Sequence, residues 1–469
     1  MLKILLSLLL LAAPWSAYEA SALSVDFAGD TYSADSQAVP APAADKSIFP
    51  VLFPFFNGSD TRAQKKKWTV MVFVNGKNDL ESAGLLNLNM MEMVGSGKDI
   101  NIVAELGRMK GQLSDDTADG DWTGSRRIYV KKDADMEKIK SPVVMTTEKV
   151  DMGDYKRAVD FVKWAKKNYP AQKYLLILWD HGSGWMDPRM DPKPAGQKGI
   201  SFDDETGNYI RTREIGAIVK EAGGVDVLAF DACLMEMGEV LSEVKGNASV
   251  MVGSEETIPG VGYPYHVFLA ALVKEPGMGA EKLGGVMVEA YKMFYEVAVK
   301  RGAQLSAVRV AKAAELETRL KAVAAAAKEV NDTAALKAAR AGVMRFDMIG
   351  ETSDPQKQIS FYGDLYNYLE LLEGAMTATG PAAEDLKAKS AALRAFIAKD
   401  LVIRNNYFDK DRTGRDFKDT HGISVYLPPV IDKIDQAKLE GIFENKYQDF
   451  EFSKATGWHD FVTYLYGVK

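Results

Sequence analysis

Two short apolar runs that end in polar residues decide the fold of this 469-residue chain: residues 174–185 (YLLILWDHGSGW) and residues 225–235 (VDVLAFDACLM). An apolar run that stops abruptly at small and polar residues is typical of a buried parallel strand leaving a sheet at its carboxyl edge. The first run ends in His181, and the second carries Cys233, the chain's one cysteine. Because sites form just outside the carboxyl ends of such strands, we expect an imidazole and a thiol there together. A cysteine nucleophile and its base are built in this way.

Each of these residues has a simpler interpretation when it is taken alone. A single cysteine in an apolar strand is more often a small core residue, and a histidine at a strand end is more often a hydrogen-bonded surface residue. The coincidence favours a site, because both residues follow apolar strands. His181 precedes Cys233 by about 50 residues, the order and separation of the caspase base and nucleophile.

Three motifs carry a resemblance to a known family: DHGSGW at 180–185, DACLME at 231–236 and SEETIPGVGYPY at 254–265. They resemble the clostripain family of cysteine peptidases, which are relatives of caspases, gingipains and legumains. Weaker matches lie at 67–81 (KWTVMVFVNGKNDLE) and 422–428 (GISVYLP), so the resemblance extends from about residue 67 to the C-terminus. It implies a caspase-like fold with a mainly parallel sheet.

Residues 1–22 have the pattern of a secretory signal. Lys3 supplies the positive start, residues 4–13 the apolar stretch, and residues 20–22 (ASA) a small-residue cleavage site. The apolar stretch is too short to span a bilayer, so we expect a cleaved signal rather than a membrane anchor. This pattern predicts a secreted or periplasmic bacterial protein, with no membrane segment once the signal is removed.

Residues 23–66 differ in composition from the rest and are typical of a tether or pro-segment. They hold AVPAPAAD and then an apolar stretch at 48–56, which we expect to pack on the folded domain. The net charge of −7 comes from interspersed acids and bases. We find no basic patch that would indicate nucleic-acid binding.

Residues 67–469 are predicted to form one peptidase domain. Over residues 67–275 strands alternate with helices, which predicts an α/β core with a mainly parallel sheet and helices on both faces. Residues 276–469 are mostly helical and are expected to form an attached subdomain, with residues 305–310 returning as a strand. Residues 234–244, directly after the cysteine, are predicted to form a helix.

The chemistry expected at this edge follows from the thiol and the imidazole. The positive end of the predicted helix and a nearby imidazolium would both favour the thiolate of Cys233, and His181 would protonate the leaving amine. By the resemblance, the backbone N–H groups of Gly182 and Cys233 stabilise the oxyanion. No third member of a triad is evident, because Asp180 and His181, as neighbours on a strand, point to opposite faces.

Asp231 is the clearest indication of specificity. In an extended chain it lies on the same face as Cys233, and a carboxylate in that cleft selects Arg or Lys by charge-assisted hydrogen bonds. The alternative is that Asp231 caps the helix expected at 234–244. The resemblance implies that the residue two before the cysteine lines the pocket. Ser254 and Glu255 are expected to add to its rim, although the acid could equally be a surface residue.

The acidic residues suggest no obligatory cofactor. Residues 409–414 (DKDRTG) begin like a calcium-binding EF-hand loop, but Thr420 stands where the bidentate glutamate belongs. Residues 203–205 (DDE) are more typical of a turn. Calcium dependence varies in the family that the chain resembles, so the sequence leaves a bound calcium ion open.

Together these features predict a secreted cysteine endopeptidase that cleaves protein or peptide substrates after Arg or Lys. The loop at 186–199 holds Arg189 and Lys198, which are candidates for self-processing of a zymogen. The main alternative is a catalytically silent binding protein on the same fold. A serine hydrolase is disfavoured, because Ser183 lies in HGSG and not in a G-x-S-x-G elbow.

Overall fold

The computed structural model describes residues 65–111, 116–187, 200–346, 360–411, 413–429 and 443–468. Arg189, Lys198, the predicted signal and all but the last two residues of the predicted tether lie outside these ranges. Within them, no helix is both long enough and apolar enough to cross a membrane.

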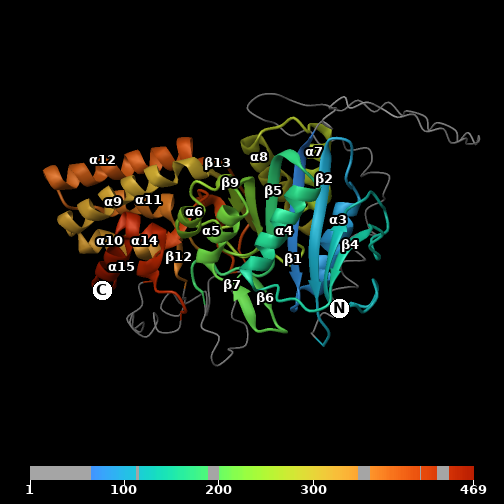
Figure 1. Ribbon diagram of the computed structural model, residues 1–469. Helices are drawn as coiled ribbons and strands as arrows, with labels where there is room; N and C mark the ends of the chain where they lie inside the picture. The colour runs from blue at the N-terminus through green and yellow to red at the C-terminus, as the bar shows by residue number, and fades with distance from the viewer. Residues whose placement is uncertain are drawn as a thin grey trace, which may run out of the picture. The chain divides into compact units, whose positions relative to one another are not determined.

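The core is a nine-stranded sheet with the strand order β13-β10-β9-β8-β5-β1-β2-β3-β4 (Figure 1). The five strands from β9 to β2 run parallel, and the strands outside them pair antiparallel. This arrangement confirms the predicted mainly parallel sheet. The strands are β1 (Lys66–Gly76), β2 (Ile100–Arg108), β3 (Gly124–Tyr129), β4 (Val143–Thr147), β5 (Ala171–Trp179), β8 (Val225–Asp231), β9 (Ala248–Gly253), β10 (Ala303–Arg309) and β13 (Val402–Phe408).

Helices cover both faces of this sheet, as the alternating pattern predicts. One face packs against α4 (Tyr155–Asn168), α5 (Thr212–Glu221) and α6 (Gly238–Glu243), and the other against α3 (Glu81–Glu92), α7 (Tyr265–Lys274) and α8 (Ala280–Phe294). The central strands are apolar because both of their faces are buried. In β5 the last five residues, LLILW, are all buried.

The helix predicted at 234–244 begins only at Gly238, so Cys233 does not lie at a helix N-terminus. The backbone at Leu234 is left-handed, with φ of 64°. The N–H of Leu234 donates to Glu256 O at 3.2 Å, and the O of Glu236 accepts from the N–H of Ser424 at 3.1 Å. The expected helix is shorter because these backbone groups bond to other segments and not along a helix.

Most elements of the second half gather on the side of the sheet that ends in β13 (Figure 1). They include α9 (Ala313–Val330), α10 (Thr333–Gly342), α11 (Leu365–Ala375), α12 (Pro381–Phe396), α14 (Glu451–Thr456) and α15 (Trp458–Gly467). The strand expected at 305–310 is present as β10, but β13 was not anticipated. The two halves therefore share one sheet.

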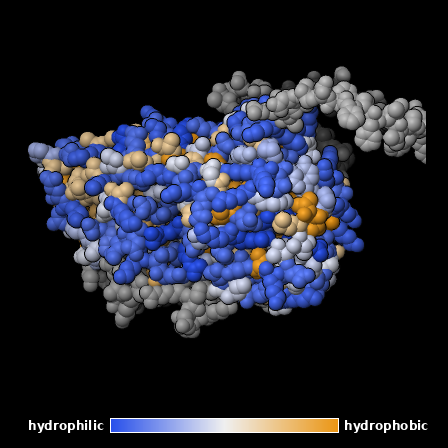
Figure 2. All heavy atoms as spheres, in the orientation of Figure 1, coloured by the Kyte–Doolittle hydropathy of each residue, from blue (hydrophilic) through white to orange (hydrophobic). Residues whose placement is uncertain are grey.

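Two smaller sheets complete the described elements. The strand β14 (Ser424–Tyr426) pairs with β12 (Tyr362–Asp364), and β12 with β11 (Arg345–Phe346). A hairpin is formed by β6 (Ile200–Asp203) and β7 (Asn208–Ile210). On the face drawn in Figure 2 the surface is mostly hydrophilic, and an apolar spot lies at the edge strand β4, where Val143–Met145 are exposed.

One buried arginine connects α10 to the end of the chain. Arg340 is 2% exposed. Its guanidinium donates to the carbonyl oxygens of Pro428 at 3.2 Å, Pro429 at 2.9 Å and Val468 at 3.0 Å, and also to that of Leu465. These carbonyls lie where water cannot replace the donor, so the arginine satisfies several acceptors at once.

We predict that Arg340→Met lowers the free energy of unfolding by about 3 kcal/mol or more, because each buried polar group left unpaired costs about 1–3 kcal/mol. Chemical denaturation of the purified protein measures this. As a control, Lys454→Met removes a half-exposed pair with Glu451 and should cost less than about 0.5 kcal/mol. Equal stability of the two variants would contradict the role of Arg340.

Candidate active site

The neighbouring strands β5 and β8 bring the predicted histidine and cysteine together. Their last paired residues are Trp179 and Asp231, and the N–H of Asp180 continues the contact by donating to Asp231 O at 3.2 Å. His181 and Cys233 each follow two residues after the last pair. The two loops therefore leave the same edge of the sheet side by side.

Gly182 allows these two loops to touch. A Cβ atom at this position would lie 2.2 Å from Cys233 O and 2.8 Å from Cys233 N. No side chain fits in that space, so glycine is required by a close approach of one backbone to another. The nearest neighbour of Gly182 is therefore the backbone of Cys233, whose N–H is the second group expected to stabilise the oxyanion.

The thiol of Cys233 is covered by the motif at 254–265. It is 9% exposed. Its Sγ accepts a hydrogen bond from the N–H of Ile258 at 3.2 Å and lies 3.8 Å from Ile258 O. The O of Ser254 also accepts from the N–H of Glu236 at 3.1 Å. The segment after β9 and the loop after β8 therefore form one bonded unit around the sulfur.

The imidazole of His181 contacts a residue that sequence reasoning missed. Its Nε2 lies 2.7 Å from Asp79 Oδ1, and the histidine side chain is 15% exposed. Asp79 follows β1, which pairs with β5 on the side opposite to β8. The signal available in the sequence was another apolar run, at 68–74, followed by polar residues.

Asp180 points away from the imidazole, as the alternation along a strand predicts. Its carboxylate accepts from Asn78 Nδ2 at 2.7 Å and from the N–H of Phe202. Burial raises the pKa of Asp180 to about 7, although its hydrogen bonds and the nearby His181 oppose the shift. Asp180 therefore fixes the loop before His181 without touching the ring.

Asp231 is a buried carboxylate that faces the segment after β9. It is 3% exposed and accepts from the N–H of Tyr263 and the hydroxyl of Tyr265, both at 3.0 Å. A Cβ atom at Gly262 would lie 2.7 Å from Asp231 Oδ2. Burial raises its pKa to about 7. Among the described residues no cation pairs with this carboxylate, so a cationic ligand would stabilise its charged form.

The side chains of Ser254 and Glu255 point into the interior. Ser254 Oγ donates to Gln304 Oε1 at 3.2 Å. Glu255 Oε2 accepts from Gln304 Nε2 and from the N–H of Gly422, both at 3.0 Å. Burial and the neighbouring carboxylate of Asp364 raise the pKa of Glu255. The acid of this segment that borders open space is the next residue, Glu256.

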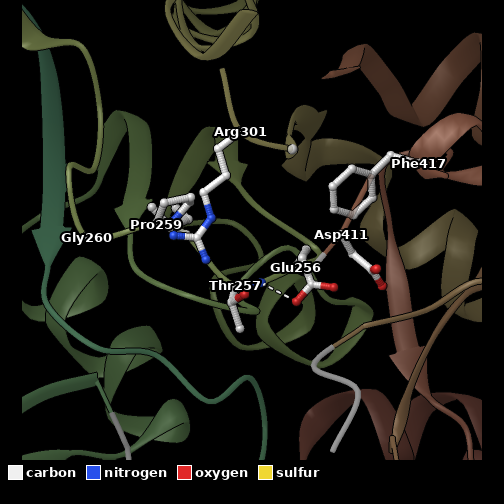
Figure 3. A pocket seen from close by; sticks show the side chains of 9 residues that line it. Glu256, Thr257, Pro259, Gly260, Arg301, Asp411 and Phe417 are labelled. Atoms are coloured by element: carbon white, nitrogen blue, oxygen red, sulfur yellow. Dashed lines mark hydrogen bonds between the residues drawn. The ribbon is translucent and has the colours of Figure 1, made fainter. Parts of the chain in front are cut away.

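A cavity of about 190 Å³ lies beside the thiol. Its walls are residues 256–260, Arg301, Gly302, Asp411 and Phe417. Figure 3 shows Arg301 reaching toward Pro259 and Thr257, with Asp411 and Phe417 on the other side. Ile258 lines this cavity and also contacts the sulfur, so one residue connects the cavity to the thiol. Two acids and one base line the space, which gives it acidic character.

Within the described ranges, no group of three or more His, Cys, Asp or Glu residues is arranged to hold a metal ion. In the EF-hand-like stretch, Asp411 Oδ1 accepts from the N–H of Thr413 at 2.7 Å and of Arg415 at 2.9 Å. That oxygen therefore caps its own turn. Calcium dependence stays a prediction.

Comparison with known proteins identifies the family. The clostripain family profile matches residues 72–465. This chain belongs to the clostripain family of cysteine peptidases. A member of it, clostripain of Hathewaya histolytica, is 31% identical over 222 residues, which are 43% of this chain and 41% of that protein. The match therefore spans less than half of clostripain's length.

Two solved structures of clostripain-family (C11) proteases share the fold. A secreted C11 cysteine protease from Bacteroides thetaiotaomicron, in complex with an irreversible peptide inhibitor, superposes with a TM-score of 0.58 at 20% identity and covers 84% of this chain and 99% of that one. An inactive zymogen C11 protease from Parabacteroides distasonis gives 0.60 at 18% identity with the same coverage. These likenesses confirm the caspase-like α/β fold.

Proposed function

We propose that this clostripain-family protein is an exported cysteine endopeptidase that cleaves peptide bonds after Arg or Lys, with His181 and Cys233 as its catalytic pair. The observation that carries the proposal is the register of β5 and β8. It delivers an imidazole and the chain's one thiol to the same edge of the sheet in a family of cysteine peptidases. The signal-like pattern at residues 1–22 supports export.

In the proposed reaction the thiolate of Cys233 attacks the carbonyl carbon of the scissile bond. The N–H groups of Gly182 and Cys233 donate to the oxyanion that forms. The intermediate collapses to a thioester and releases the amine, which takes a proton from His181. Water then attacks the thioester and returns a proton to the imidazole, which restores both groups.

The thiolate depends on its immediate neighbours more than the sequence suggested. Because α6 begins at Gly238, no helix N-terminus faces the sulfur. The imidazolium of His181 is then the main source of positive charge. The N–H of Ile258, at 3.2 Å from Sγ, adds one hydrogen bond to the sulfur. A charge-assisted bond of this kind stabilises the thiolate relative to the thiol.

For the specificity we propose that Asp231 binds the cationic side chain of the residue before the scissile bond. The support is a buried carboxylate with no cation beside it in the described structure, two residues before the nucleophile. Glu256, which lines the cavity next to the thiol, is the second candidate. No metal or organic cofactor enters these proposed steps, and the sequence leaves a bound calcium ion open.

The second candidate function is a catalytically silent binding protein on the same fold. The observation in its favour is the burial of Cys233, a residue that is 9% exposed and whose sulfur accepts from the N–H of Ile258. A protein of this kind would bind basic peptides without cleaving them.

Peptide-amide substrates ending in Arg or Lys separate the two functions. We predict that the purified mature protein releases the fluorophore and that Cys233→Ala and His181→Ala reduce release to background. The two residues act as a unit, so their losses are similar. Iodoacetamide has the same effect on the wild type. The control Ser183→Ala keeps activity, since Ser183 Oγ donates to Met186 O. Activity that survives without Cys233 or His181 would refute the pair.

A second prediction concerns Asp231. Asp231→Asn should lower kcat/KM for Arg and Lys substrates. The loss corresponds to about 2–5 kcal/mol in transition-state binding, the cost of breaking a buried charge pair. Cleavage after uncharged residues changes little. Because the pKa of Asp231 is about 7, the carboxyl becomes neutral as the pH falls below that value. In the wild type, the rate of cleavage after Arg divided by the rate after uncharged residues should therefore fall as the pH falls. In Asp231→Asn this ratio should not change with pH.

The matched variant for this experiment is Glu256→Gln, which removes the charge of one of the two acids that line the cavity. A preference for Arg that survives Asp231→Asn but is lost in Glu256→Gln would move the specificity to the cavity.

A third prediction concerns maturation, which we propose is self-processing at Arg189 or Lys198. Both residues have the side-chain type that the proposed pocket accepts, and they lie between the histidine and cysteine strands. Wild type, but not Cys233→Ala, should slowly become two fragments on a denaturing gel, with a new N-terminus at Met190 or Gly199. The run at 65–67 (KKK) is a second candidate, where a cut would release the pro-segment. An intact and fully active wild type would rule this step out.

A further inference from the structure

Two consecutive residues after β1 pair with two consecutive residues after β5. Asn78 Nδ2 donates to Asp180 Oδ1 at 2.7 Å, and Asp79 Oδ1 lies 2.7 Å from His181 Nε2. The strands before them are in register through Val74 and Trp179. The contact between Asp79 and the imidazole is therefore set by the sheet and not by the chance position of a surface side chain.

The residues on either side of Asp79 are held firmly. Lys77 is fully buried, its Nζ lies 2.9 Å from Asp203 Oδ2, and it donates to Val150 O at 2.6 Å. Asn78 is 1% exposed, and its Oδ1 accepts from the N–H of Leu80 at 2.9 Å. The Asp79 side chain itself is 58% exposed. Its backbone position is thus fixed by its neighbours, while its carboxylate remains at the surface beside the ring.

We propose that Asp79 is the positioning residue for His181 and so forms the third member of a Cys–His–Asp arrangement. This inference rests on the proposed peptidase function. With Nε2–H donating to Asp79, the neutral ring carries its proton on Nε2 and leaves Nδ1 for the thiol. The same hydrogen bond holds the ring in one orientation, as the third group of an activated nucleophile does.

Other groups around the ring do not take this role. Asp180, the other acid beside His181, points away and is bonded to Asn78 and Phe202. Asp231, at the end of β8, is buried and accepts from the N–H of Tyr263 and the hydroxyl of Tyr265. The geometry of a nucleophile, a base and a third group that orients the base is the general form of an activated nucleophile.

The first test is kinetic. Asp79→Asn keeps the shape and removes the charge, and it should lower kcat about tenfold to a hundredfold with little change in KM. Replacing the buried aspartate of a catalytic triad by asparagine lowers kcat about 10⁴-fold. We expect a smaller loss for Asp79 because its side chain is exposed and solvent screens its charge. Asp79→Glu should restore part of the rate. The control is Asp385→Asn on α12, which removes an equal charge from a half-exposed side chain.

The second test does not depend on peptidase activity. Cys233 is the chain's one cysteine, so the iodoacetamide rate reports this thiol alone. Without the Asp79 carboxylate the ring is no longer held with its proton on Nε2 and Nδ1 left for the thiol, so it takes the thiol proton less readily. Alkylation should therefore slow severalfold near pH 7, while the rate near pH 10, where a free thiol ionises unaided, stays the same.

The outcomes are distinct. If Asp79→Asn matches Asp385→Asn in both kcat and the alkylation profile, the inference is overturned. It is also overturned if Asp79→Asn loses rate and thermal stability together, with an unchanged profile and no rescue by Asp79→Glu. If the wild type cleaves no peptide, the proposed function fails, and the alkylation profile still decides whether Asp79 acts on His181.

Discussion

The parallel pairing of β5 with β8 is the constraint on which the rest of the site depends. Two strands that end in register at Trp179 and Asp231 leave the sheet at one edge, so residues equally far beyond those ends must be neighbours. A slip of one residue in either strand would turn its side chains to the other face. The apolar faces of both strands prevent that slip, because they are buried under helices on both sides. The same burial that stabilises the core therefore fixes where the loops that carry His181 and Cys233 begin.

Buried carboxylates hold the loops that leave this edge. Asp180 accepts from Asn78, Asp231 from the N–H of Tyr263, and Glu255 from the N–H of Gly422. Backbone N–H groups in irregular loops need acceptors when they are buried, and a carboxylate oxygen supplies a strong one. Burial opposes the charge and raises the pKa of all three acids. The hydrogen bonds to these acids hold the loops in place, but burying the acids has an unfavourable desolvation free energy.

Strand neighbours could be predicted from the sequence, because apolar runs of the length of β5 and β8 have few other places in an α/β fold. The surroundings of the sulfur could not. Whether the residues after Cys233 form a helix depends on Leu234 taking a left-handed conformation and on backbone bonds to Glu256 and Ser424. Those partners lie far along the chain, so local propensity for a helix was overridden by tertiary hydrogen bonds. The contact of Asp79 with His181 was missed because the two residues lie 102 positions apart in the sequence and meet only through the pairing of β1 with β5.

The segment after β9 contacts both Cys233 and Asp231. It donates to the sulfur through Ile258, accepts from the cysteine loop through Glu256 O, and contributes the Tyr263 N–H to Asp231. Under the proposed specificity, a substrate side chain at Asp231 would lie against the same backbone that covers the thiol. Small shifts in such a bonded unit are shared by its members, since packed interiors deform little. The surroundings of the sulfur and those of Asp231 are therefore parts of one bonded unit, and the positions of both depend on the same stretch of backbone.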